Sequence, residues 1–501
     1  MSAPLEHAPP SPGTAGHLTA APAVPEEPLP LFLKASWGVG GLGTTSMLYL
    51  VNMFVVFFLV RHVGVPAAVA GALLAVTRLY DAVIDPLIGT LSDRSEGRWG
   101  RRRPWMLAGA LLSPLACIAV FNPPVLEPGP GLYAVVLGAL LLYCTGYSLF
   151  SIPYMAQGAE MTDHYGERAA VMAWRTFFVY AAGIVITAGA PALVALLGSD
   201  RPAYSVMSFA AAAVVGSTML WVAAFTGQAR VTPRSSEPLA PLQSLRTALS
   251  NKPFVVILAT KMTLQLGTAF TGAAMLFFMA DVLDRGEGAL ALLGLVSNLV
   301  GVVAVPIWSR VLRKVERRPL FIGLLLAHSL GYLSWLLASH EEPQALFVAR
   351  AFVLGALGAG SVLVAMAMLT DTIELDRLTT GQRREGLFVG AFELMQTTSF
   401  VVGPLIVGVA FSAAGLVPGM AGRNAQPQAA LDLMRIAVSV VPAACALAGV
   451  ALMSIYRLDA DRLSGLRAAA DDGAQAVPPA PSTTNASASR AVRTGSSITS
   501  L

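Results

Sequence analysis

The sequence predicts an all-helical integral membrane protein with twelve membrane-spanning helices. The chain of 501 residues is 55% hydrophobic and only 12% charged, with a mean hydropathy of +0.65, whereas soluble proteins carry about 25% charged residues. Its apolar residues form runs of about 20 residues or more, the length of a helix that crosses a bilayer. This composition excludes a water-soluble globule, a disordered protein and a nucleic-acid-binding protein.

Twelve apolar runs are long enough to span a membrane, and they are too long and too uniformly apolar for membrane strands. They lie at residues 36–60, 66–91, 104–123, 131–159, 169–197, 203–226, 253–282, 289–311, 319–338, 345–369, 386–414 and 431–456. Arginine and lysine concentrate in every second loop, which favours the cytoplasmic side for those loops. We therefore expect a multi-pass membrane protein with both termini in the cytoplasm.

The chain divides into two predicted halves of six helices each. The N-terminal half covers 31–226 and the C-terminal half 253–457, joined by a polar cytoplasmic loop at 227–252. Residues 1–30 and 458–501 have the composition of disordered tails. The two halves share a motif at equivalent positions. Arg102-Arg103-Pro104 begins the third helix, and Arg317-Arg318-Pro319 begins the ninth. Six-plus-six repeats of this kind predict the major facilitator fold.

Few charges lie inside the predicted spans, and each is a candidate for function because a charge at mid-bilayer costs at least about 2.5–3.5 kcal/mol. They are Arg78, Asp81, Asp85, Arg175, Lys261 and Glu393. The spacings of three and four place Arg78, Asp81 and Asp85 on one helix face. Two such carboxylates can coordinate one cation, or repel each other until one holds a proton. Alternatively, they form a structural Arg–Asp clamp.

Three segments then indicate a family. RLYDAVIDPLIGTLSDRSEGRWGRRRPWML (from Arg78), SIPYMAQGAEMTDHYGERAAVMAWRTFF (from Ser151) and MLTDTIELDRLTTGQRREGLFVGAF (from Met368) resemble the glycoside–pentoside–hexuronide:cation symporters. The resemblance covers about residues 33–457. It implies cation-coupled transport by alternating access, with no cofactor other than a coupling Na⁺ or H⁺.

The resemblance also implies roles for individual residues. Asp81 and Asp85 would bind the cation, and they would be the only metal site, should the cation be Na⁺. Arg175, Tyr147 and Ser148 would contact the substrate. Cytoplasmic gating residues would tie the halves together in the outward-facing state and release on opening; these are Asp93, Arg101 and Arg102.

The chain departs from the melibiose permease subgroup at three positions. Thr45 and Ser151 stand where that subgroup carries aspartates, and Thr397 stands where it carries a lysine. In exchange, Lys261 and Glu393 lie at equal predicted depth, about 12 Å from their cytoplasmic helix ends at 1.5 Å per residue. We expect both, together with Gln265, in the substrate site, Lys261 replacing the lost lysine and Glu393 serving as its partner or as a proton carrier. A fixed structural pair is the alternative.

Two further patterns are weaker indicators of function. Gly38-Val39-Gly40-Gly41-Leu42-Gly43 matches a dinucleotide-binding fingerprint, but it lies in an apolar helix, so close helix packing is expected instead. His328 is isolated in its predicted helix and is expected to be hydrogen-bonded or to line a cavity rather than to bind a metal.

We therefore predict a monomeric symporter, not an enzyme, whose partners are the lipid bilayer and a small substrate, either a sugar, a glycoside or a sugar acid. The missing aspartates and Lys261 leave open a non-sugar substrate such as a lysolipid, a drug-like molecule or an anionic metabolite. A transport-inactive membrane sensor is the second alternative.

Overall fold

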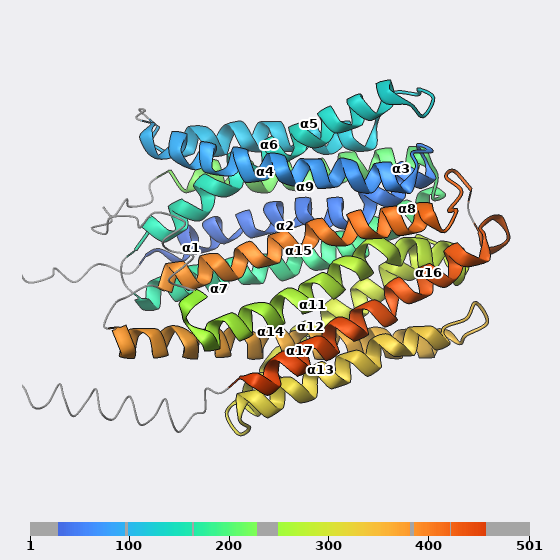
Figure 1. Ribbon diagram of the computed structural model, residues 1–501. Coiled ribbons are helices and arrows are strands. Elements are labelled where there is room, and N and C mark those ends of the chain that lie inside the picture. The colour runs from blue at the N-terminus through green and yellow to red at the C-terminus, as the bar shows by residue number, and fades with distance from the viewer. Residues whose placement is uncertain are drawn as a thin grey trace, which may run out of the picture.

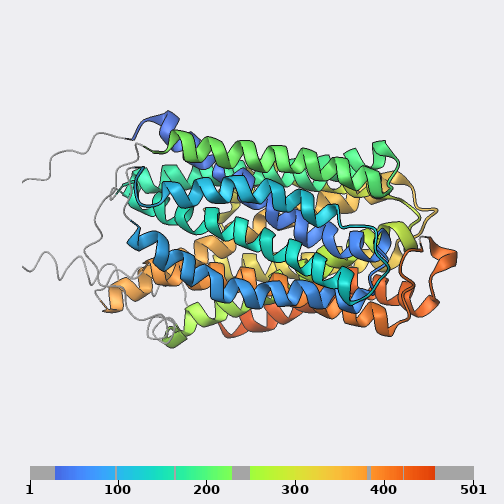
Figure 2. The ribbon, with the colours of Figure 1, turned by 90° about the horizontal axis from the view of Figure 1, so that it is seen from above.

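The computed structural model is a bundle of long helices that run roughly parallel to one axis (Figure 1). Figure 2 shows the same arrangement after a turn of 90°, with the connecting loops gathered at the two ends of the bundle. The structure describes residues 29–95, 99–162, 165–227, 249–380, 385–420 and 422–456, and these ranges contain helices and turns but no strand. The predicted tails and most of the predicted central loop lie outside the described residues.

Short π-helical segments (η1, η2 and η3) interrupt several of the long helices, and η4 and η5 are short 3₁₀ helices. The N-terminal half contains α1 (Leu31–Gly38), α2 (Gly40–Leu50), η1 (Val51–Val55), α3 (Val56–Arg61), α4 (Ala67–Arg94), α5 (Arg103–Phe121), α6 (Pro130–Glu160), α7 (Tyr165–Ile184), η2 (Val185–Gly189), α8 (Ala190–Leu197) and α9 (Arg201–Phe225). The C-terminal half contains α11 (Lys252–Phe277), η3 (Phe278–Val282), α12 (Glu287–Leu312), α13 (Arg317–Leu333), η4 (Ser334–Leu337), α14 (Gln344–Thr380), α15 (Glu385–Ala413), η5 (Arg423–Ala425), α16 (Gln428–Val438) and α17 (Val440–Ile455).

The all-helical membrane fold is confirmed. In the described part of the chain, eleven helical segments are long and apolar enough to cross a membrane. The remaining predicted run falls on α15, a helix of 29 residues that spans about 43 Å at 1.5 Å per residue. One boundary differs clearly, because α14 continues to Thr380 rather than ending near residue 369. The apolar run ends there, but residues 370–380 contain no glycine or proline that would end the helix, so it extends as a polar segment.

Contacts between the halves involve a few specific helices. α4 packs along α15, while α7, η2 and α8 pack along α12. α11 also contacts η1 and α3. Within the N-terminal half, α5 packs along α6 and α9, and within the C-terminal half α12 packs along α14, and α11 packs along α15 and α17. The two helices that carry most of the predicted site in the N-terminal half, α4 and α6, are thus in direct contact.

The described ends of the chain lie together. α1 begins and α17 ends at the same end of the bundle, which we call the terminal end (Figure 1). The opposite, distal end holds a buried ion pair that joins the halves. Arg61, the last residue of α3, donates to Asp281 in η3 with 2.5 Å between Nη2 and Oδ2. The two side chains are 6% and 0% exposed, so both charges are shielded from solvent.

Further polar contacts join the halves at the distal end. The Tyr204 hydroxyl donates to the Glu287 carboxylate at 3.0 Å. The Gly419 amide donates to the Val60 carbonyl at 3.0 Å, and the Ala68 amide donates to the Ser412 hydroxyl at 2.8 Å. The backbone amide of Gly422 completes the ion pair by donating to the second oxygen of Asp281 at 2.9 Å. The structure is therefore closed between the halves at its distal end.

We expect the Arg61–Asp281 pair to be strongly coupled. Arg61→Met and Asp281→Leu should each lower the free energy of unfolding by about 3–5 kcal/mol, because each leaves one buried polar partner uncompensated. The double variant Arg61→Met/Asp281→Leu should recover much of this loss. Denaturant unfolding of the purified protein in detergent measures all three.

The matched control is His340→Ala. His340 and Glu341 face each other at 3.6 Å, but their side chains are 48% and 83% exposed, so this change should cost less than about 1 kcal/mol. A double-mutant cycle in which the Arg61 and Asp281 losses simply add would contradict the coupling.

Candidate substrate and cation sites

Asp81 lies on α4 inside the bundle, and only one of its oxygens is paired. Arg78 Nη1 lies 3.1 Å from Asp81 Oδ2, and the two side chains are 13% and 15% exposed. The predicted helix spacing therefore does bring these two groups together. The other oxygen, Asp81 Oδ1, is buried and accepts no hydrogen bond in the described part of the molecule, although the thiol of Cys144, a weak donor, interacts with the same carboxylate. A buried acceptor without a donor is uncommon in proteins and points to a missing ligand such as an ion or a water molecule.

Asp85 lies one turn further along α4, and its side chain contacts a neighbouring helix. Its Oδ1 accepts a hydrogen bond of 2.5 Å from the Ser148 hydroxyl of α6. The Tyr80 and Thr145 hydroxyls link the same two helices at 2.8 Å. An Arg–Asp clamp between helices is thus only partly observed. Arg78 pairs with Asp81 within α4, and Ser148 provides the link from α4 to another helix.

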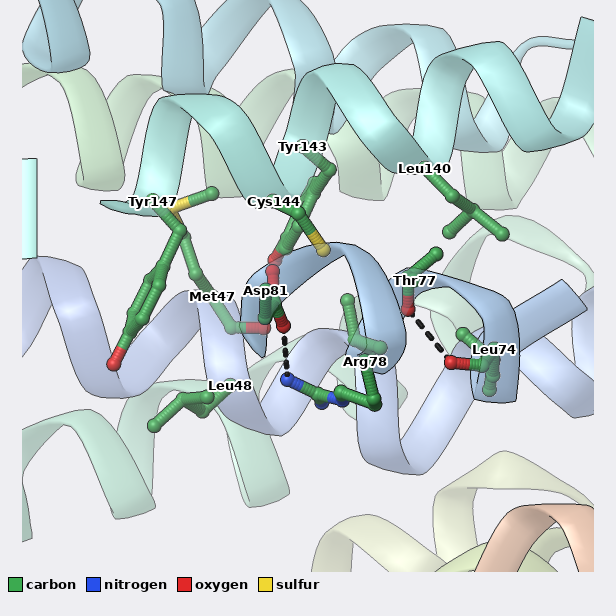
Figure 3. A pocket seen from close by; sticks show the side chains of 11 residues that line it. Met47, Leu48, Leu74, Thr77, Arg78, Asp81, Leu140, Tyr143, Cys144 and Tyr147 are labelled. Atoms are coloured by element: carbon green, nitrogen blue, oxygen red, sulfur yellow. Dashed lines mark hydrogen bonds and ion pairs between the residues drawn. The ribbon is translucent and has the colours of Figure 1, made fainter. Parts of the chain in front are cut away.

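A small cavity of about 20 Å³ adjoins Asp81 between α2, α4 and α6 (Figure 3). Its polar lining includes Thr77, Arg78, Asp81, Tyr143, Cys144 and Tyr147. The volume exceeds the roughly 10–15 Å³ that one water molecule needs, so an ion or a water molecule fits and a sugar does not. Figure 3 places the Cys144 thiol and the Asp81 carboxylate on the same side of the cavity. The carboxylate and hydroxyl oxygens that line this cavity could coordinate Na⁺, and the carboxylate could accept a proton.

Arg175, predicted to contact the substrate, is positioned by the close approach of α7 to α1 and α2. A Cβ atom at Gly41 would lie 2.8 Å from the Arg175 carbonyl oxygen, and one at Gly38 would lie 2.9 Å from the Trp174 carbonyl carbon. The expectation that these glycines serve packing is therefore confirmed. Arg175 Nε is buried and lacks a hydrogen-bond partner in the described structure.

Lys261 and Gln265, both on α11, line a second cavity that is much larger. It has a volume of about 300 Å³ and lies wholly within the C-terminal half, between α11, α13, α14, α15 and α17. The Lys261 ammonium lies 3.5 Å from the centroid of the Phe392 ring of α15, a cation–π contact. The side chain of Glu393, the next residue, lies outside the described residues, so a Lys261–Glu393 pair stays a prediction.

The residues predicted to act as gates form one cluster at the terminal end of the N-terminal half. Arg102 lies 2.8 Å from Asp93 and 2.5 Å from Glu160, and Arg101 lies 2.7 Å from Glu160. Burial lowers the pKa of the Arg102 guanidinium, but its hydrogen bonds and charge interactions with Glu160 and Asp93 outweigh burial and raise the pKa above its usual value. These described partners all belong to one half, so the gating role stays a prediction.

The positions at which the chain departs from melibiose permease are buried where they can be described. Thr45 on α2 is 7% exposed and Ser151 on α6 is 8% exposed, while the Thr397 side chain lies outside the described residues. Neutral residues at Thr45 and Ser151 leave Arg78, Asp81 and Asp85 as the charged side chains on the α4 face beside α2 and α6.

Apart from the predicted gating residues and Arg175, the predicted site residues that the structure describes fall into two groups. Asp81, Tyr147 and the Asp85–Ser148 pair gather around α4 and α6, and Lys261 and Gln265 gather in the larger cavity. The sequence analysis did not identify three further polar residues that line the larger cavity, namely Thr268, Tyr332 and Ser361. The prediction that His328 is hydrogen-bonded or lines a cavity is confirmed. The sequence analysis also missed the Arg61–Asp281 pair, because both residues lie at helix ends and neither was counted among the charges inside the predicted spans.

Comparison with known proteins places this arrangement in a family. A family model described as MFS/sugar transport protein matches residues 36–460. The chain belongs to this family. A putative glycoside/cation symporter of Escherichia coli is 28% identical over 433 residues, covering 85% of this chain and 92% of that protein. A glucuronide carrier protein homologue of the same organism is 27% identical, covering 81% and 88%.

Solved structures agree with the family. The crystal structure of a D-xylose–proton symporter has a TM-score of 0.62 at 14% identity and covers 85% of this chain and 97% of that chain, which supports the major facilitator fold. Members of the MFS/sugar transport family are transporters. The protein is accordingly a multi-pass secondary transporter and not an enzyme.

The close contact between α2 and α7 gives a test of how Arg175 is held. Gly41→Ala should lower the melting temperature and weaken substrate uptake, because the added methyl group would lie 2.8 Å from the Arg175 carbonyl oxygen and 3.0 Å from its Cγ and must push α7 away.

Gly138→Ala in α6 is the matched control. A Cβ there meets no described atom within 4 Å, so this change should be neutral or stabilise by about 0.5–1 kcal/mol. Equal melting temperatures and uptake for Gly41→Ala and the unmodified protein would show that the contact is not needed.

Proposed function

We propose that this transporter is a symporter that couples Na⁺ or H⁺ movement to uptake of a sugar, glycoside or sugar acid by alternating access. The observation that carries the coupling is Asp81 Oδ1, a buried carboxylate oxygen that accepts no hydrogen bond from the described residues and lies beside a cavity large enough for one ion. The names of the relatives, a putative glycoside/cation symporter and a glucuronide carrier homologue, support both the cation and the substrate class.

The coupling follows from linked binding. A cation at Asp81 and Asp85 would neutralise the α4 carboxylates and fix α4 against α6 through Ser148. If cation and substrate bind the same conformer more tightly together than apart, each gradient can drive the other solute. This is why we assign the paired carboxylates to the cation and the remaining polar side chains, Arg175 and Lys261 among them, to the substrate.

Orientation follows the distribution of basic loops. With the terminal end in the cytoplasm of a bacterial cell, the buried Arg61–Asp281 pair closes the outer side and the protein is in an inward-facing or occluded conformation. The Asp93–Arg101–Arg102 cluster would then be in its released arrangement, with its described partners inside one half. A monomer is sufficient for this cycle, since both halves belong to one chain.

Na⁺ should stabilise the purified protein by an amount that depends on Asp81. At a Na⁺ concentration of about 100 times its Kd, the gain is about 2.7 kcal/mol, and Asp81→Asn should abolish it because the amide carries no charge. Thermal unfolding with Na⁺ and with choline as the replacement cation measures the effect.

Asp432→Asn, an exposed position on α16, controls for the loss of one carboxylate and should keep the full Na⁺ response. If neither protein responds to Na⁺ but a pH gradient drives uptake that requires Asp81, the coupling ion is H⁺. An Asp81→Asn protein with an unchanged cation response and unchanged coupling would refute the site.

A second candidate is a transporter of the same fold with a non-sugar substrate. Thr45 and Ser151 favour it, because they replace two carboxylates that would grip sugar hydroxyls. Uptake into proteoliposomes of radiolabelled sugars, sugar acids and a lysolipid separates the candidates, since the sugar proposal requires cation-driven accumulation of a member of the first two groups.

A further inference from the structure

His62 lies at the distal end of the bundle, where the two halves meet. It directly follows Arg61, the N-terminal partner of the buried ion pair with Asp281. Its ring packs against Tyr204 of α9, with ring centroids 4.7 Å apart, and the Tyr204 hydroxyl donates to Glu287 of α12 in the other half. His62 therefore adjoins two of the contacts that close this end of the molecule.

One nitrogen of the His62 ring is buried and unpaired. Nε2 is shielded from solvent and has no hydrogen-bond partner among the residues that the structure describes. Besides Tyr204, the rings of Phe57 and Phe58 lie near the imidazole, with centroids 6.1 and 5.9 Å away. A protonated imidazole donates from both nitrogens, so a proton on this ring would leave a buried, charged donor without an acceptor.

The charged groups that face His62 already have partners. They come from α3, from the start of α9 and from α12, and they are Arg61, Asp200, Arg201 and Glu287. Arg61 is paired with Asp281. Asp200 caps α9 by accepting a hydrogen bond of 2.9 Å from the Ala203 amide, and Arg201 donates to the Pro123 carbonyl. The two acids therefore attract a proton on His62 only from a distance.

Burial and charge act on His62 in opposite directions. Burial is the largest influence and lowers the pKa of the imidazole, Glu287 and Asp200 raise it, and Arg61 and Arg201 lower it. The net effect lowers the pKa, so the closed distal end favours the neutral ring. Separation of the halves would return Nε2 to water, where a histidine has its ordinary pKa of about 6.5.

The sign of the pH effect follows from this difference. A group whose pKa is lowered in one conformation binds protons better in the other, so acid shifts the equilibrium toward the conformation that binds the proton. For His62 that conformation is the one with the distal end open. The shift begins as the pH falls through about 6.5 and is absent well above that value.

We propose that His62 is a proton-binding switch of the distal end, and that its protonation favours separation of the two halves on that side. The neutral ring fits the closed packing against Tyr204, whereas the protonated ring requires water or an acceptor. In the proposed orientation the distal end faces the exterior, so an acidic exterior favours the outward-open conformation. This inference rests on the alternating access of the proposed function, but it does not depend on the coupling ion or the substrate.

Distances between spin labels across the distal end test the switch in the full-length protein in lipid nanodiscs at constant Na⁺ concentration. Val125→Cys and Leu337→Cys place the labels at exposed positions of the two halves, in a background whose three native cysteines are replaced with alanine. Lowering the pH from 8 to 5 should raise the ratio of open to closed molecules at least about fivefold. His62→Phe keeps the aromatic packing but cannot titrate, and it should reduce this change to less than about twofold.

His340→Ala is the matched control, because it removes an exposed histidine at the same end of the molecule and should keep the full response. If His62→Phe does not fold, His62→Gln provides a second ring-free, non-titrating variant with the same expected loss. Glu287→Gln should move the midpoint of the response to lower pH, because it removes the acid that raises the pKa of His62 most. A full response in both His62 variants would overturn the proposal, and so would closure of the distal end by acid.

The Asp81→Asn variant separates the switch from the proposed cation site. A pH response that is lost in Asp81→Asn but kept in His62→Phe would belong to the cation site and would overturn the switch. A response that needs His62 in a protein without gradient-driven uptake would support the switch and contradict symport. Uptake that needs Asp81, in a protein whose distal end ignores pH, would support symport and overturn the switch.

Discussion

The pairing of Arg78 with Asp81 is the interaction on which the chemistry of the N-terminal half depends. A lone carboxylate inside a membrane bundle is strongly destabilising, and an arginine one turn away offsets much of this effect. The second oxygen still accepts no hydrogen bond from the part of the chain that the structure describes. This oxygen gives the cavity beside it an electrostatic reason to hold a cation. The other contacts around α4, such as the Asp85–Ser148 bond, keep that oxygen at a fixed place.

In the proposed cycle, the cation binds in the N-terminal half and part of the substrate site lies in the C-terminal half, and α15 is the physical connection between them. This helix packs along α4, which carries the paired carboxylates, and along α11, which carries Lys261 and Gln265. It also contributes Phe392, against which the Lys261 ammonium rests. A movement of α4 on cation binding would therefore shift one wall of the larger cavity, which is a direct route for coupling through packed side chains.

The sequence predicted the local features well and the long-range ones poorly. Helix positions follow from runs of apolar residues, and the Arg78–Asp81 pair follows from a spacing of three, because both depend on one stretch of chain. The Asp85–Ser148 and His328–Ser361 contacts join different helices, and they depend on how far each helix is rotated and tilted. No spacing rule reports those quantities. Arg61 and Asp281 are 220 residues apart, so only packing of the two halves brings them together.

The buried Arg61–Asp281 pair has a consequence for the rate of transport. Every cycle that opens the distal end must return both charges to water and then remove them again, so the pair contributes to the barrier between the two conformations. Hydration of charged groups becomes less favourable as temperature rises, which makes the closed arrangement relatively more stable in warm conditions. The conformational equilibrium of this transporter is thereby tied to the temperature at which the cell grows.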